Sequence, residues 1–283
     1  MLGHSLLQNL AGEHEVKVTV RNSLNAYLPS DLFRPDNTYD SVDIRDSAAL
    51  HTTLRHFKPH AIINAAGIVK QRKAAKDHIS SIEINALFPH RLAAMAAAES
   101  IRLFQVSTDC VFSGRRGHYQ ESDLPDPFDL YGRTKLLGEV DNSGCVTLRT
   151  SIIGLEVASR QGLVEWALSQ HGEIGGYVNA MYSGVTTREL ARVLNLLLTR
   201  VTTLHGVWHV ASEPISKFNL LTSLFGAIGR TDVTVVPDYS VSCDRTLDGS
   251  AFSRVTGYVT PPWQSMLDEL AADIRHREAT TYS

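Results

Sequence analysis

The segment Ile101-Arg-Leu-Phe-Gln-Val-Ser-Thr-Asp109 decides the fold, because an apolar strand runs directly into polar residues. Residues 101–106 have the length and character of a buried strand, and Ser107, Thr108 and Asp109 follow its carboxyl end. Around this segment, strand-like and helix-like stretches alternate through the first 150 residues. Such alternation indicates βαβ units and a parallel sheet. We therefore expect a doubly wound α/β fold that binds ligands at the carboxyl ends of its strands.

Element boundaries in this first half follow from apolar periodicity and from capping residues. The predicted helices cover residues 2–10, 47–57, 82–98 and 131–140, and the predicted strands cover residues 16–20, 61–63, 101–106 and 146–149. Asp46 and Asp129 are the expected caps of the second and fourth helices. Pro89 lies inside the third helix, where we expect a kink.

The second half is less regular, and we place a soft domain boundary near residue 150. Residues 172–184 are rich in turn residues, which predicts an irregular segment. Thr186 and Glu189 form a capping box before a predicted helix over residues 190–198. Two more amphipathic helices are predicted, one from Ser216 to Gly229 and one over residues 263–274.

Composition excludes several classes of protein. The 283 residues are 43% hydrophobic and 20% charged, as in ordinary globular chains. The 27 basic and 30 acidic residues leave a formal charge of −3, which argues against nucleic-acid or anionic-membrane partners. The longest purely apolar run, residues 92–98, is far shorter than the ~20 residues that span a bilayer. Three scattered cysteines and no visible export signal make the cytoplasm the expected compartment.

The segment Tyr131-Gly-Arg-Thr-Lys135 carries the sharpest chemical signal. Its i, i+4 spacing places Tyr131 and Lys135 on one face of a helix. A phenol with its usual pKa of ~10 is a poor acid at neutral pH, and a nearby ammonium lowers that pKa. Tyr131 could then donate a proton to a substrate carbonyl, while Lys135 reaches a ribose hydroxyl. A solvated Tyr–Lys pair on a surface helix is the alternative for so short a motif.

Two strand ends supply the context for this pair. The hydroxyl of Thr108 can hydrogen-bond a substrate oxygen, and Asn64-Ala-Ala-Gly67 is small enough for a flat cofactor to approach the backbone. Each stretch taken singly is also an ordinary strand-end turn. The three features in the expected order favour an active site at the carboxyl ends of the strands.

These residues resemble the extended short-chain dehydrogenases/reductases. More narrowly, they are similar to the dTDP-4-dehydrorhamnose reductase group, which reduces the 4-keto group of a nucleotide-linked deoxysugar. The matching segments are Asn64-Ala-Ala-Gly67, Val106-Ser-Thr-Asp-Cys-Val-Phe112 with Gly114, Tyr119-Gln-Glu121 with Asp123, Pro127, Tyr131-Gly-Arg-Thr-Lys-Leu-Leu-Gly-Glu139 and, more loosely, Arg149-Thr-Ser151 and Asp244-Arg-Thr-Leu-Asp248. The resemblance implies an NAD(P)-binding Rossmann domain over residues 1–150. It also implies a smaller α/β lobe over residues 151–283 that mainly binds substrate, with some segments returning to the sheet.

The resemblance also implies roles for single residues. Tyr131 would be the proton donor, Lys135 would lower its pKa and hold the nicotinamide ribose, and Thr108 would stabilise the developing alkoxide. Thr108 and Asp109 would contact the sugar. Asn85 would support the backbone of the active site, with a helix-surface asparagine as the alternative. The expected cofactor-binding residues are Met1, Leu2, Gly3, Arg21, Asp43, Ile44, Gly67, Ile68, Val69, Val106, Tyr131 and Lys135.

The expected reaction is reduction of a nucleotide sugar for cell-surface polysaccharide precursors. Arg21 ends the predicted strand 16–20, and an arginine there suits the 2′-phosphate of NADP, whereas NAD prefers a carboxylate. We therefore expect NADP rather than NAD, although Arg21 could also be a simple solvent-facing residue. Asp109-Cys110 lacks the glutamate of the 4,6-dehydratases, which favours a reductase. An epimerase and a non-catalytic NADP-binding regulatory subunit are the alternatives, and a homodimer is a further expectation.

The start of the chain departs from the family pattern. Met1-Leu2-Gly3-His4 resembles only the end of the Gly-x-x-Gly-x-x-Gly turn that cradles pyrophosphate at a helix N-terminus. The first strand and two glycines of that pattern are absent, so we expect roughly 15 residues to be missing upstream.

Other candidate sites are weaker. His56 and His60 have helical spacing, but Pro59 lies between them, and we expect no metal site. Cys110 is expected to be a small residue near the active site. Trp166 and Trp263 lie on amphipathic faces and are expected in the core.

Overall fold

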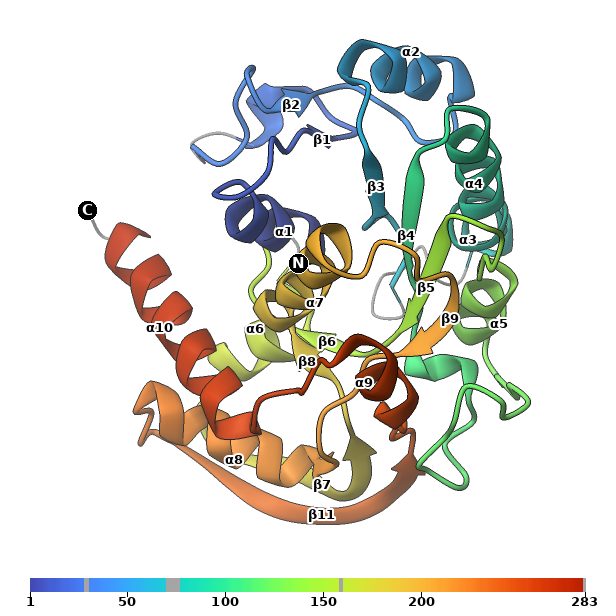
Figure 1. Cartoon of the computed structure of the whole chain (residues 1–283). Helices are drawn as coiled ribbons and strands as arrows, with labels where there is room; N and C mark the ends of the chain where they lie inside the picture. Colours follow the sequence, from blue (N-terminus) through green and yellow to red (C-terminus); the bar gives the residue numbers. More distant parts are fainter. Residues whose placement is uncertain (28–30, 70–76, 158–159, 282–283) are drawn as a thin grey trace.

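The centre of the computed structural model is a parallel sheet of four strands in the order β3-β4-β5-β9 (Figure 1). The structure describes residues 1–27, 31–69, 77–157 and 160–281. The sheet contains β3 (Ala61–Asn64), β4 (Arg102–Val106), β5 (Cys145–Arg149) and β9 (Gly206–His209). All three ladders between them are parallel. Because β9 pairs with β5, the second half of the chain contributes a strand to the sheet of the first half.

Helices cover both faces of this sheet. Side chains alternate along β4, so Phe104 packs with α1 (Leu2–Leu10) and α7 (Thr187–Thr199) on one face. Leu103 packs with α2 (Ser47–Phe57) and α4 (Phe88–Ala98) on the other face. Both side chains are fully buried. The predicted α/β fold with a doubly wound parallel sheet is confirmed.

A separate parallel pair precedes the sheet along the chain. It consists of β1 (Val18–Thr19) and β2 (Thr38–Tyr39), with a single-turn helix η1 (Leu24–Tyr27) after β1. The strand is shorter than the predicted residues 16–20. Among the described residues, no ladder joins this pair to the four-stranded sheet. Asp46 caps α2 as predicted, since its side chain accepts hydrogen bonds from the backbone N–H groups of Ala48 and Ala49.

The helix predicted over residues 82–98 has a different form. A short α3 (His78–Ser81), capped by Asp77, continues into the π-helical η3 (Ile82–Leu87) and then into α4. The wide turns come before Pro89, which occupies the first turn of α4. Because α4 continues from η3 without a break, Pro89 stands inside the helix and leaves one carbonyl group of the preceding turn without its N–H donor. The irregularity was predicted, but it is a π segment ahead of the proline rather than a kink at it.

Residues 172–182 form the long strand β7 (Gly172–Tyr182), so the prediction of an irregular segment was wrong. β7 pairs in parallel with β11 (Val233–Asp244) and antiparallel with β10 (Ile215–Ser216). Figure 1 shows β11 sweeping along the lower edge of the molecule, with α8 (Lys217–Ile228) packed over β7. A Cβ on Gly176 would lie 2.8 Å from the Cα of Phe218, so glycine lets α8 approach the strand closely.

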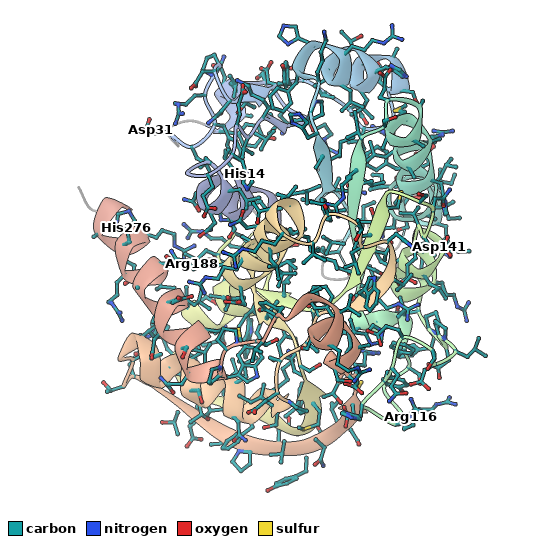
Figure 2. The ribbon with its side chains drawn as sticks, in the orientation of Figure 1. His14, Asp31, Arg116, Asp141, Arg188 and His276 are labelled. Carbon is teal, nitrogen blue, oxygen red and sulfur yellow. The ribbon has the colours of Figure 1, made fainter. Side chains whose placement is uncertain are left out.

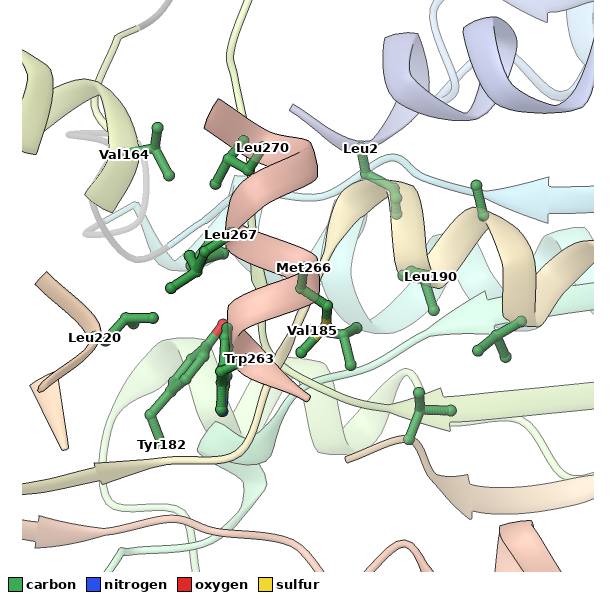
Figure 3. Packing of buried hydrophobic residues seen from close by; sticks show 14 of the residues in the cluster. Leu2, Val164, Tyr182, Val185, Leu190, Leu220, Trp263, Met266, Leu267 and Leu270 are labelled. Carbon is green, nitrogen blue, oxygen red and sulfur yellow. The ribbon is translucent and has the colours of Figure 1, made fainter. Parts of the chain in front are cut away.

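The remaining elements close the second half of the chain. β6 (Ile152–Ile153) pairs with β8 (Val185–Thr186), and the other elements are α6 (Leu163–Leu168), α9 (Ser250–Thr256), which contacts β9, and α10 (Trp263–Thr281), which contacts β8. In Figure 3, Trp263 lies beside Tyr182, and Met266 and Leu267 follow further along α10. Trp263 is 9% exposed, as predicted for the core. Trp166 is 39% exposed, so its predicted place in the core was wrong.

Many charged side chains lie at the surface, and Figure 2 labels several charged and histidine residues, among them Arg188. Arg188 of α7 reaches Asp273 of α10 at 2.7 Å and ties these two helices together. The capping box before α7 is only half formed. Thr186 accepts from the backbone N–H of Glu189, but the Glu189 carboxylate accepts instead from Arg192 and Tyr258. In the described ranges, no helix combines the length and apolar character needed to cross a membrane.

Candidate active site

A cavity of about 320 Å³ lies where β3, β4 and β5 end. Residues from both halves of the chain line it. The predicted site residues that it brings together are Met1, Leu2, Gly67, Ile68, Val69, Val106, Thr108, Asp109, Tyr131 and Lys135. Parallel strands present their carboxyl ends at one edge of a sheet, which is why residues so far apart in the sequence converge.

Four predicted cofactor residues do not line this cavity. Gly3 lies inside α1, where an added Cβ would be 3.9 Å from the Cβ of Ala65. Ile44 packs into the apolar cluster beneath α2 and α4. Asp43 forms an ion pair with Arg45 at 2.5 Å, and hydrogen bonds from Arg45 lower the pKa of the Asp43 carboxyl to about 2. Arg21 is exposed after β1, and its charge also acts on Asp43. Arg21 and Asp43 therefore lie near each other, but apart from the cavity wall.

Helix α5 (Leu130–Leu137) carries both residues of the Tyr–Lys pair. Asp129 caps it as predicted, with Oδ1 accepting from the N–H of Gly132 at 2.8 Å. Two glycines let the helix approach its neighbours closely. A Cβ on Gly132 would lie 2.2 Å from the carbonyl oxygen of Cys110, and a Cβ on Gly138 would lie 1.9 Å from that of Asn85. Backbone contacts at both ends of α5 thus fix its position over the strand ends.

The Tyr131 phenol lies against the polar end of β4. Burial raises its pKa, and the neighbouring Cys110 thiol acts in the same direction, while a hydrogen bond with Thr108 opposes them. The Thr108 hydroxyl donates to Oδ1 of Asp109 at 3.0 Å and accepts from the N–H of Cys110 at 3.1 Å. The phenol is therefore held in its protonated form beside an oriented hydroxyl.

The Lys135 ammonium is directed at the strand rather than at the phenol. It is 6% exposed, and Nζ donates to the carbonyl oxygen of Val106 at 2.6 Å. Burial lowers the pKa of Lys135 to about 8, against the opposing charge of Glu139. Lys135 is not among the groups that shift the Tyr131 pKa. The expected lowering of that pKa by Lys135 is thus not seen in this structure.

Asn85 supports the loop that follows β3. Its Oδ1 accepts from the N–H of Ile68 at 2.8 Å, and its Nδ2 donates to the carbonyl oxygen of Ile68 at 3.0 Å. The side chain is only 2% exposed, so the alternative of a helix-surface asparagine was wrong. The π-helical turn of η3 directs this side chain toward the cavity loop instead of toward solvent.

A buried ion pair lies behind the strand ends. Arg149 donates to Glu139 through Nε at 2.8 Å and through Nη2 at 2.7 Å, and these side chains are 6% and 8% exposed. Glu139 Oε1 also accepts from the Ser107 hydroxyl at 2.6 Å. The carboxylate therefore joins the end of β4, the end of β5 and the turn after α5. The sequence analysis matched these residues to the family without seeing this bond network.

The sequence analysis missed the cavity residues that come from beyond residue 151, and two of these, Tyr182 and Lys217, lie against each other. Tyr182 ends β7, and Lys217 is the first residue of α8. The Lys217 ammonium lies 3.6 Å from the centre of the Tyr182 ring. The only sequence signal near Lys217 was the cap at Ser216, which predicts a helix start and no chemistry. Thirty-five positions separate Tyr182 from Lys217, and only tertiary structure joins them.

The remaining candidates have other surroundings. Nδ1 of His56 hydrogen-bonds the hydroxyl of Tyr39 at 2.7 Å. Within the part of the chain that the structure describes, no group of three His, Cys, Asp or Glu side chains could hold a metal ion. Cys110 lines the cavity beside Thr108 and Asp109, close to the place expected from the sequence.

Comparison with known proteins supports the family resemblance seen in the sequence. The sequence profile of the RmlD substrate binding domain matches residues 1–276. The chain belongs to this family. It is thereby placed among the NAD(P)-dependent oxidoreductases of the extended short-chain dehydrogenase/reductase class, which confirms the resemblance seen in the sequence.

Three relatives illustrate the range of this likeness. The dTDP-4-dehydrorhamnose reductase of Aggregatibacter actinomycetemcomitans is 26% identical over 258 residues, 83% of this chain and 88% of that protein. Methionine adenosyltransferase 2 subunit beta of Pongo abelii is 34% identical over 42% of this chain and 37% of its own length. The crystal structure of dTDP-4-dehydrorhamnose reductase from Bacillus anthracis, in complex with NADP, has a TM-score of 0.73 at 22% identity, covering 92% of this chain and all of that one.

The residues present fit a dinucleotide of this kind. Met1 and Leu2 put the N-terminus of α1 at the cavity, and the N–H groups of a helix N-terminus suit a phosphate. Ala65, Ala66 and Gly67 form a floor of small residues after β3. A Cβ on Gly67 would come within 3.4 Å of Oδ1 of Asn85, so a larger residue there would crowd the side chain that holds the loop.

Proposed function

We propose that this protein is an NADP-dependent reductase of a nucleotide-linked 4-keto-deoxysugar, serving the synthesis of cell-surface polysaccharide precursors. The observation that carries the proposal is the convergence of Thr108, Tyr131 and Lys135 in one cavity at the carboxyl end of β4. The named activity of the Aggregatibacter relative supports the substrate class. Residues 1–150 would bind the cofactor and residues 151–283 mainly the sugar nucleotide. We further propose that the protein works in the cytoplasm as a homodimer.

The side chains of the cavity can complete a carbonyl reduction. When bound, NADPH supplies hydride chemistry at the carbonyl carbon, so the protein must deliver one proton to the carbonyl oxygen. Tyr131 donates that proton, because its raised pKa keeps the phenol protonated until negative charge develops beside it. The Thr108 hydroxyl, whose one proton goes to Asp109 in this structure, would turn this proton toward the same oxygen and stabilise that oxygen by hydrogen bonding. The carbon gains a hydride and the oxygen a proton, which gives the alcohol.

Other residues would hold the cofactor. Lys135 donates to Val106 in this structure and has further N–H donors that can reach a ribose hydroxyl. The N-terminus of α1 would take the pyrophosphate, and Gly67, Ile68 and Val69 would line the nicotinamide half. Arg21 is exposed, and its guanidinium can bind a 2′-phosphate, which is why we propose NADP rather than NAD.

Tyr131→Phe tests the reaction directly. With dTDP-4-dehydrorhamnose and NADPH, followed by the absorbance of the reduced nicotinamide, turnover should fall by about 10²–10⁴-fold, because the proton donor is lost. The dissociation constant of NADPH should change by less than about twofold, since the phenol ring stays in place. Tyr177→Phe is the matched control, because Tyr177 is 41% exposed on β7. Unchanged turnover in Tyr131→Phe would remove Tyr131 from the mechanism.

The partial likeness to methionine adenosyltransferase 2 subunit beta favours one second candidate, a non-catalytic NADP-binding subunit. That role is supported if no dTDP- or UDP-linked keto-sugar is reduced while a second protein is captured stably. An epimerase would instead interconvert two sugar nucleotides without net consumption of NADPH. The same assay therefore separates the three functions.

A further inference from the structure

Among the polar side chains that the second half of the chain gives the cavity, two that the proposed mechanism does not use lie against each other. Tyr182 and Lys217 line it together with Thr108 and Asp109. They come from the end of β7 and the start of α8, elements that pack directly on each other. Both side chains are therefore held by regular structure and not by a loop.

These two side chains have unused hydrogen-bonding capacity. Tyr182 is 4% exposed, and its buried hydroxyl lies beside the Ser151 side chain without a hydrogen bond of regular geometry among the described residues. Lys217 packs its ammonium on the Tyr182 ring, and within the described ranges its Nζ makes neither a hydrogen bond nor an ion pair. An ammonium carries three donors, and buried donors left unpaired are costly. A ligand oxygen would satisfy groups that the protein leaves open.

Asp109 faces the same space. It is 8% exposed, and its Oδ1 accepts from Thr108 at 3.0 Å, while Oδ2 has no hydrogen-bond partner in the described structure. The charge of Asp109 acts on both Lys217 and Tyr182, but the described residues show no ion pair between Asp109 and Lys217. The two opposite charges thus line one cavity without forming an ion pair with each other in the described structure.

Lys217 keeps its charge near neutral pH. Burial lowers its pKa to about 8, while the charges of Asp109 and Cys110 act against that change. At pH 7 the side chain is therefore still mainly an ammonium, although it is half-buried. The cavity then presents a donor and an acceptor, one on either wall.

Resting on the proposed function, we propose that Lys217 and Asp109 together recognise a neutral hydroxyl group on the substrate carbon beside the reducible carbonyl. A hydroxyl can accept from the ammonium and donate to the carboxylate at once. A phosphate or carboxylate in the same place would be repelled by Asp109, and a methylene would leave both charged groups unpaired. The Asp109 carboxylate is hydrogen-bonded to Thr108, and in the proposed mechanism Thr108 stabilises the carbonyl oxygen of the substrate. The hydroxyl that Asp109 recognises therefore belongs to the carbon next to that carbonyl.

The test compares two substrates that differ in this hydroxyl alone, dTDP-4-dehydrorhamnose and its 3-deoxy analogue. The native protein should prefer the hydroxylated substrate by about 100-fold or more in kcat/KM, because the analogue leaves buried polar groups unpaired. In Lys217→Met, the apolar stem still covers the Tyr182 ring but the donors are gone. This variant should lose most of the preference, through a large loss on the hydroxylated substrate and a much smaller loss on the analogue.

Lys217→Arg, which keeps the charge, should retain more of the preference than Lys217→Met. The dissociation constant of NADPH, measured in parallel, reports whether the variants are folded. Equal losses of Lys217→Met on both substrates, or no loss on either, would overturn the proposal. So would a native protein that reduces both substrates equally well, although the proposed function would then stand.

A native protein that reduces neither substrate would overturn the proposed function instead. The hydroxyl proposal is then decided by calorimetric titration with dTDP-rhamnose and its 3-deoxy counterpart. A loss of affinity in Lys217→Met that is selective for dTDP-rhamnose supports the proposal. Equal binding of the two ligands by the native protein overturns it.

Discussion

At the scale of single residues, burial acts in opposite directions on Tyr131 and Lys135, which lie one helical turn apart. It raises the pKa of the phenol and lowers the pKa of the ammonium to about 8. In each case the charged form is disfavoured by the loss of water. The phenol therefore keeps its proton for the substrate, whereas the ammonium stands within about one pH unit of losing its own under physiological conditions.

The affinity for NADPH should consequently fall as the pH rises through about 8. The affinity falls rather than rises because the protonated Lys135 is the form that donates to a ribose hydroxyl. This form is lost well below the usual lysine pKa of ~10.4, since the folded-state pKa is lowered. We expect the dissociation constant, measured by nicotinamide fluorescence, to be constant below about pH 7 and to rise steadily above pH 8.

Two variants serve as controls for this pH dependence. Lys135→Met should bind NADPH more weakly and without the rise above pH 8. Lys217→Met should retain the rise, because Lys217 lies at the substrate side of the cavity and has a pKa lowered by burial to a similar value. A native protein whose affinity for NADPH is the same at pH 7 and pH 9 would contradict the assignment to Lys135.

At the scale of elements, the site depends on how closely α5 approaches its neighbours. In Gly132→Ala, the new Cβ would meet the carbonyl oxygen of Cys110 at 2.2 Å, so the helix must move by about 1 Å to relieve the contact. A displacement of that size can lower turnover by about 100-fold, because Tyr131 and Lys135 move with the helix. We expect that loss in kcat, together with about 1–3 kcal/mol of lost stability from overpacking.

Gly226→Ala is the matched control for this prediction. Gly226 also lies inside a helix, α8, but an added Cβ there would have nothing within 4 Å. We expect unchanged turnover and a gain of about 0.5–1 kcal/mol, since alanine restricts the unfolded chain. Denaturant unfolding and steady-state assays of both variants check the pair. Full activity in Gly132→Ala would show that the position of α5 does not limit the reaction.

The elements also show where sequence reasoning reaches its limit. Helices that have a capping residue and an apolar face were predictable, because both features can be read from neighbouring residues. Examples are α2, which follows Asp46, and α8, which lies between Ser216 and Gly229. β7 was not, because its glycines signal a turn when read alone, whereas Gly176 is needed for the close approach of α8. For the helix predicted over residues 82–98 the sequence predicted an irregularity at Pro89 but not its π form, in which Asn85 hydrogen-bonds the backbone of Ile68.

At the scale of the whole molecule, the cavity joins segments that are distant in the sequence. The part built on strand ends of the first half was predictable, because the parallel sheet brings Gly67, Thr108 and Tyr131 to one edge. The contribution of Tyr182 and Lys217 was not, because nothing in the sequence relates β7 and α8 to the end of β4. The missing information is tertiary packing rather than residue chemistry.

Because a cofactor would bridge α1, the loop after β3 and α5, its binding should stabilise the whole chain. At 100 times its dissociation constant, a ligand adds about 2.7 kcal/mol to the free energy of unfolding. For a chain of this size that corresponds to a rise in Tm of roughly 4–5 °C. NADPH should raise Tm more than NADH at equal concentration, because Arg21 is exposed beside Asp43 and can pair with a 2′-phosphate.

Arg21→Ala isolates that pairing. In this variant the rise in Tm caused by NADPH should shrink to that caused by NADH, while the NADH value and the Tm of the free protein stay within about 1 °C of the native protein, as for other surface substitutions. Arg45→Ala is the matched control, because Arg45 is also exposed but already pairs with Asp43. If Arg21→Ala keeps the full difference between the two dinucleotides, the preference for NADP lies elsewhere in the chain. If the native protein shows no difference, the preference itself is wrong, and Arg21 is a solvent-facing residue at the end of β1.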